Sequence, residues 1–237
     1  MKCQNCKSLL VEDARFCSQC GQSTKDLNRP FWHLISESFF ELFDIDGRLS
    51  STLQNLLFKP GNLSSSYRAG RRVSYTPPLR IYLVTSLLLF FVMSLVKADY
   101  GNNQELISFI VLPNGLLEEI PKIMVVLLPI YALLLQISQP RSNYIFNLVC
   151  SVYIHTFWYF LFILFLLLQF LHSYIPSIIY LGWLIILYLV IYLVIAIKKF
   201  YGVSWLKSFI INVFTISIYL GAISLGLEIA IALKESF

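Results

Sequence analysis

The first twenty residues contain the cysteines whose spacing could hold a metal ion. They form two C-x2-C pairs separated by ten residues: Cys3, Cys6, Cys17 and Cys20. Each pair can turn both sulfurs inward on a tight turn, and two such turns supply four tetrahedral ligands at about 2.3 Å from a zinc ion. Gly21 follows the second pair, where such a turn commonly needs a positive φ. The spacing predicts a zinc ribbon with one structural zinc per chain and no open catalytic position.

The charge of this segment indicates what the ribbon could bind. Residues 1–29 contain five basic and three acidic side chains. Four thiolates and one zinc ion add a formal charge of about −2, which brings the segment to about zero. Nucleic-acid modules depend on a basic surface. We therefore do not expect nucleic acid as a partner, and predict a protein-docking or purely structural module.

Polar residues within long apolar stretches are the other candidates for chemistry, because burying an ionisable group in a membrane is unfavourable. His155 can stay neutral and bond between helices, and Glu228 near the end of its stretch can reach water. Paired carboxylates and a Ser/Lys dyad are absent from these stretches, so we predict no catalytic residues. A possible polar site within the membrane would comprise Asn147, His155, Asn212 and Glu228.

The elements that position these residues are predicted to be membrane-spanning helices. Of the 237 residues, 57% are hydrophobic and 13% charged, against about 25% charged in a soluble domain. Apolar runs of about 20 residues match the hydrocarbon thickness of a bilayer. We predict an all-α integral membrane protein in which residues 79–237 form a five-helix domain, with a break near Gly202. The spans are expected at about 79–96, 121–138, 146–171, 177–197 and 209–233.

The distribution of lysine and arginine predicts the orientation of these helices. The segments before the first span, between the second and third, and between the fourth and fifth hold 15 of the 18 basic residues. Only Lys97, Lys122 and Lys234 fall on the other side. Cytoplasmic loops carry the excess of positive charge, so we expect the N-terminus in the cytoplasm and, after five crossings, the C-terminus outside. The reducing cytosol disfavours two disulfides, the alternative to zinc.

Residues 29–78 are predicted to form an amphipathic, basic collar between the ribbon (1–28) and the spans. An apolar helical face over residues 31–43 could lie in the membrane interface or pack on the bundle. A second amphipathic helix is expected at 48–58, and Asn62 is expected to cap a third at 63–69 that ends at Gly70.

The chain has no acidic residue from 47 to 98, where it approaches the bilayer. Basic groups here either enforce the orientation or bind anionic headgroups. The candidates for headgroup binding are Arg68, Arg71, Arg72 and Arg80. In the last span, small residues at four-residue spacing would allow a close helix contact, within one chain or in a homo-oligomer.

The residues ahead of the first span contain, in this order, the motifs T-x3-L, PG, Y, G-[KR]-R and Y-x-x-P. They are Thr52, Leu56, Pro60, Gly61, Tyr67, Gly70, Arg71, Arg72, Tyr75 and Pro78. This pattern behind a cysteine module resembles a bacterial zinc-ribbon multi-pass membrane protein family known only as a domain of unknown function. The resemblance implies the bacterial cytoplasmic membrane as the location and implies no activity.

Together these features predict a non-enzymatic adaptor or scaffold. Its zinc ribbon and basic collar would engage a cytosolic protein or anionic lipid. The alternatives are a small transporter or channel, lined by the polar residues of the spans, and, more weakly, an intramembrane enzyme.

Overall fold

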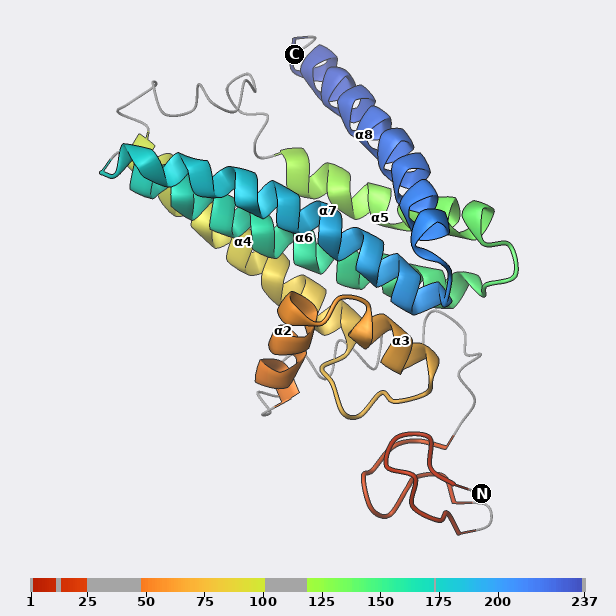
Figure 1. Cartoon of the computed structure of the whole chain (residues 1–237). Helices are drawn as coiled ribbons and strands as arrows, with labels where there is room; N and C mark the ends of the chain where they lie inside the picture. The colour runs from red at the N-terminus through yellow and green to blue at the C-terminus, as the bar shows by residue number, and fades with distance from the viewer. Residues whose placement is uncertain (1, 12–13, 25–47, 101–118, 173, 236–237) are drawn as a thin grey trace.

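The computed structural model describes residues 2–11, 14–24, 48–100, 119–172 and 174–235 (Figure 1). The helix expected at 31–43 lies outside these residues. Apart from the cysteine module (residues 2–11 and 14–24) and the loops, the described chain is helical. Within the described residues there is no strand, and two isolated β-bridges occur in the cysteine module.

The helices fall where hydropathy and turn residues predict them. The fourth predicted span begins with a 3-10 turn, and α7 and α8 separate at Gly202, whose φ is 68°. The elements are α2 (Arg48–Phe58), α3 (Asn62–Arg68), α4 (Pro78–Tyr100), α5 (Glu119–Ser138), α6 (Tyr144–His172), η3 (Pro176–Ile179), α7 (Tyr180–Tyr201) and α8 (Trp205–Glu235).

Four of these helices are long and apolar enough to cross a membrane. They contain the stretches Pro78–Val96, Tyr144–His172, Tyr180–Tyr201 and Trp205–Ile229. The apolar stretch of α5, Lys122–Ser138, is shorter. The outer faces of these helices expose large apolar side chains, among them Leu87 at 70%, Trp183 at 68% and Leu206 at 70%. Such a surface suits hydrocarbon rather than water, and we conclude that this is a membrane protein.

Helix α6 is at the centre of the bundle and packs against α4, α5, α7 and α3, while α8 packs on α5 and α7 (Figure 1). Four rings from α5, α6 and α8 fill the space where these helices meet: Tyr131, His155, Trp158 and Tyr219. Every pair of these rings has centroids 4.9 to 5.7 Å apart. Aromatic rings at this separation are in direct contact, so the middle of the bundle is packed rather than open.

The described part of the collar, residues 48–77, is seated on the bundle. Leu56 and Leu63 are buried in the same core cluster as residues of α6 and α7. The start of α3 corrects one prediction. Its N-cap is Gly61, with φ 69° and no side-chain cap bond. Asn62 is the first helical residue, and its amide instead donates to the side-chain oxygen of Asn55 at 2.7 Å.

A polar network ties the collar end of the bundle together. Asn147 of α6 donates to Gln136 of α5 at 2.7 Å, and the Tyr201 hydroxyl of α7 donates to Asn147 at 2.8 Å. From the collar, Arg68 Nη1 donates to the carbonyl of Phe200 at 3.0 Å. The end of α5, the start of α6 and the end of α7 therefore lie together, on the side occupied by α3.

Candidate metal centre

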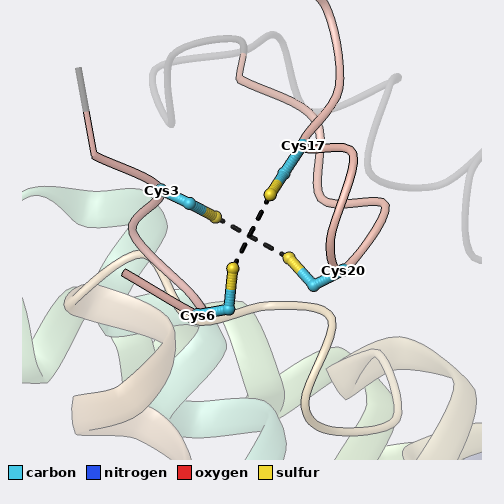
Figure 2. A group of neighbouring side chains, drawn as sticks. All are labelled: Cys3, Cys6, Cys17 and Cys20. Atoms are coloured by element: carbon cyan, nitrogen blue, oxygen red, sulfur yellow. Dashed lines mark hydrogen bonds between the residues drawn. The ribbon is translucent and has the colours of Figure 1, made fainter. Parts of the chain in front are cut away.

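The four cysteines of the N-terminal module converge on one point (Figure 2). Their sulfurs all lie within 4.8 Å of one another, with 3.7 Å between Cys3 and Cys20 and 3.6 Å between Cys6 and Cys17. Four sulfurs about 2.3 Å from a central zinc ion would be about 3.8 Å apart along each tetrahedral edge, whereas a disulfide requires about 2.05 Å. The cluster can therefore hold a metal ion, and its size is compatible with zinc.

Two equivalent turns build this cluster. In the first, the N–H of Cys3 donates to the carbonyl of Ser8 at 2.9 Å, and in the second the N–H of Cys17 donates to that of Gln22 at 2.8 Å. The residue after each pair has a positive φ, 64° at Lys7 and 70° at Gly21. Sequence reasoning identified Gly21 only. The equivalence of the two C-x2-C pairs was the signal that could have identified Lys7.

Hydrogen bonds to the sulfurs favour the charged thiolate form that binds metals. The Ser8 hydroxyl, 3.3 Å from the Cys17 sulfur, is the main cause that lowers the pKa of Cys17 to about 6. The same hydroxyl and the backbone N–H of Ser8 lower the pKa of Cys6. Burial instead raises the pKa of Cys20 to about 11, although a coordinating metal deprotonates such a thiol. Ser8 is thus a supporting residue that the sequence analysis missed.

The module is docked on the loop between α3 and α4. Gln22 Nε2 donates to the carbonyl of Gly70 at 2.6 Å, and the N–H of Arg72 donates to Gln22 Oε1 at 3.2 Å. The Ser74 hydroxyl donates to Asn5 at 2.7 Å. Gly70 has φ 83°, and a Cβ there would lie 2.0 Å from the side chain of Gln4. Both cysteine turns therefore contact residues 70–74, and side chains with no distinctive sequence signal make the contact.

The four arginines predicted to bind headgroups occupy different environments. Arg68 and Arg71 are exposed, and Arg71 donates to the Ser66 hydroxyl at 3.3 Å. Arg72 is half-buried, and Arg80 is only 4% exposed. The arginines thus do not form one uniform exposed surface, and headgroup binding by them stays a prediction.

The polar residues of the spans belong to separate contacts. Asn147 is part of the network at the collar end, and Asn212 donates to the carbonyl of Leu193 at 3.2 Å. The Tyr219 hydroxyl is 2.7 Å from His155 Nε2, while Nδ1 is 2.8 Å from the carbonyl of Ser151. A carbonyl only accepts, so Nδ1 carries the proton and Nε2 accepts from Tyr219. Glu228 is exposed. Among the described residues, no hydrogen bond joins any two of these four side chains, and their role in transport stays a prediction.

The small residues of α8 include a contact within the chain. A Cβ on Gly226 would lie 3.3 Å from Ile123 of α5, whereas one on Gly221 would meet nothing within 4 Å. Gly226 therefore allows α5 and α8 to approach closely, and a homo-oligomer through α8 stays a prediction.

The comparisons with known proteins concern the collar. A family model described as "Protein of unknown function (DUF3667)" matches residues 46–90. This segment of the chain is similar to a family of unknown function. The match covers α2, α3, the loop that contacts the cysteine module and the first part of α4. Comparisons with curated proteins and with solved structures gave no match.

Proposed function

We propose that this chain is a non-enzymatic membrane adaptor whose metal-bound cysteine module holds a cytosolic protein close to the bilayer. The observation that carries the proposal is the docked module with an apolar outer surface. Leu9, Val11 and Phe16 are 78%, 76% and 62% exposed on a module of about two dozen residues. Several exposed large apolar side chains on so small a module favour an interaction site, and the near-zero charge of the module favours a protein over an anionic lipid surface.

Zinc is the metal proposed for the cysteine cluster. Cys3, Cys6, Cys17 and Cys20 would each supply one thiolate, which is the usual composition of a closed structural zinc site. The ion would hold the two cysteine turns together, and the backbone and hydroxyl groups around the sulfurs would stabilise the thiolates.

Five crossings, with the N-terminus in the bacterial cytoplasm and the C-terminus outside, are the proposed topology. The support is the polar network that joins the end of α5, the start of α6 and the end of α7 at the collar side. These are the ends flanked by most of the basic residues, which favours placing them in the cytoplasm. The number of crossings is five if α5 spans the membrane and four if it does not.

Reporter fusions test this topology. With five crossings, alkaline phosphatase fused after residue 237 is expected to be active, because this enzyme folds only outside the cytoplasm. Green fluorescent protein fused after Ser142 is expected to fluoresce, because the loop between α5 and α6 would be cytoplasmic. If α5 does not cross, both results reverse, and the proposed topology is then wrong.

Photocrosslinking tests the adaptor proposal. We expect p-benzoylphenylalanine in place of Phe16 to form one discrete adduct with a cytosolic protein in cells, and expect the adduct to disappear when Cys3 and Cys6 are replaced by serine. The control places the same group at Phe58, an aromatic residue of α2 that is 75% exposed. Adducts with lipid alone, or the same products from Phe16 and Phe58, would count against the adaptor function.

A further inference from the structure

Arg80 is a buried cation at the start of α4. Its side chain is 4% exposed, and its Nη1 has no hydrogen-bond acceptor among the described residues. No ion pair reaches it within the described part of the chain, and residues 47–98 contain no acidic side chain. A buried guanidinium without an acceptor is strongly unfavourable. Buried groups of this kind call for an ion or solvent partner from outside the protein.

Thr76, four residues before Arg80, has a second unpaired polar atom. Its side chain is 1% exposed, and its Oγ1 has no partner among the described residues, although its N–H donates to Thr52 Oγ1 at 2.8 Å. Thr76 precedes the first residue of α4, Pro78, by two positions, and Arg80 follows it by two. The two unpaired atoms thus belong to residues on either side of the first helical residue in the sequence.

The start of α4 adds to the attraction for an anion. The N-terminal end of a helix has a partial positive charge. Pro77 and Pro78 have no N–H, and the N–H of Ile81 donates to the carbonyl of Pro77 at 3.2 Å, so only the N–H groups of Leu79 and Arg80 are left at this helix start. Because the Thr76 hydroxyl is unpaired, it does not cap these groups. α4 has 23 residues, so its dipole is fully developed. Helix starts of this kind are common phosphate sites.

We infer that Arg80, Thr76 and the start of α4 bind one phosphate-bearing anion. A guanidinium matches the geometry of phosphate oxygens, and a threonine hydroxyl can donate to a further oxygen. The position at the beginning of the first span suits the headgroup of a phospholipid, and a soluble phosphate has the same chemistry. The site rests on the proposed membrane placement of α4 and does not depend on a cytosolic partner for the cysteine module.

Arg141, in the loop between α5 and α6, provides a matched control. It has the same charge as Arg80, but it is exposed and is not among the arginines predicted to bind headgroups. Replacing either arginine by glutamine removes one positive charge. Only the Arg80 variant removes the buried, unpaired donor.

Native mass spectrometry of the full-length protein in neutral detergent tests the site. Phosphatidylglycerol is the lipid probe, and inorganic phosphate, followed by calorimetry, is the soluble probe. We expect one tightly retained phosphatidylglycerol per chain. Arg80→Gln should reduce the affinity about tenfold or more, because it removes a charged hydrogen bond, and Thr76→Val should reduce it by a smaller factor, because it removes a neutral one. Arg141→Gln is expected to bind within about twofold of the unmodified chain, as for an exposed charge.

Each outcome decides the proposal. The same dependence on Arg80 with inorganic phosphate, but not with the lipid, supports the site and identifies a soluble anion. Equal losses in Arg80→Gln and Arg141→Gln, or no loss in either, overturn it. If Arg80→Gln is not monodisperse, Thr76→Val decides: reduced binding supports the site, and unchanged binding overturns it. The Phe16 adduct is a separate readout, so failure of the adaptor proposal can be told apart from failure of the anion site.

Discussion

Combining Cys3→Ser with Cys6→Ser is expected to release the metal and unfold the cysteine module while the helical bundle still inserts. The two changes remove half of the ligands. Structural zinc contributes about 10–16 kcal/mol of binding free energy in small modules. A module of about two dozen residues cannot form a sufficient apolar core without the metal. Elemental analysis should show zinc falling from about one ion per chain to near zero.

Hydrogen exchange should report the same loss at the docking surface. The amides of the cysteine module and the Arg72 amide, which donates to Gln22, are expected to lose protection together. Cys150→Ala is the control, because Cys150 is buried in the helical core and not in the cluster. The double variant keeping its metal would contradict the four-cysteine site. Iron in place of zinc would contradict only the identity of the ion.

The helices were predictable from the sequence because a membrane imposes a simple requirement on composition. Long apolar runs give α4, α6, α7 and α8, and the break at Gly202 follows from a residue that tolerates positive φ. The cysteine cluster was predictable because two C-x2-C pairs leave few other arrangements. In both cases a local pattern contains the information needed.

The contacts between distant segments were not predictable in this way. Gln22 and Asn5 fix the cysteine module to residues 70–74, but neutral polar side chains occur on any surface and give no pattern. Arg80 resembles the neighbouring arginines in sequence, and only the packing of other segments around it makes it buried. Asn62 has the right type for a helix cap, yet Gly61 takes that position because α7 approaches it too closely for a side chain.

The segment similar to the family of unknown function contains the residues that build the collar. Thr52 accepts from the N–H of Thr76 and so ties α2 to the loop ahead of α4. Leu56 fills the core, and Gly70 lies against Gln4. These residues hold the collar between the cysteine module and the spans. In this chain, the matched segment is therefore a structural joint between the cysteine module and the helical bundle.

Gly61→Ala is expected to destabilise the protein strongly by displacing the collar from α7. Gly61 has φ 69°, and a Cβ there would lie 2.6 Å from the carbonyl oxygen of Ala196 and 3.0 Å from its Cα. The left-handed conformation alone costs about 1–2 kcal/mol for alanine. The clash is with the backbone of a packed helix, which cannot rotate away, so we expect a total loss of about 3–5 kcal/mol, at the upper end for single substitutions.

Gly202→Ala separates these two effects. Its φ is 68°, nearly that of Gly61, but a Cβ there would meet nothing within 4 Å. Gly202→Ala should therefore lose only the conformational part, about 1–2 kcal/mol, when the free energy of unfolding is measured in mixed detergent micelles. Equal losses in the two variants would mean that α3 can move off Ala196 at little cost. The metal content of Gly61→Ala should remain unchanged, because the hydrogen bonds that dock the cysteine module are made to residues 70–74.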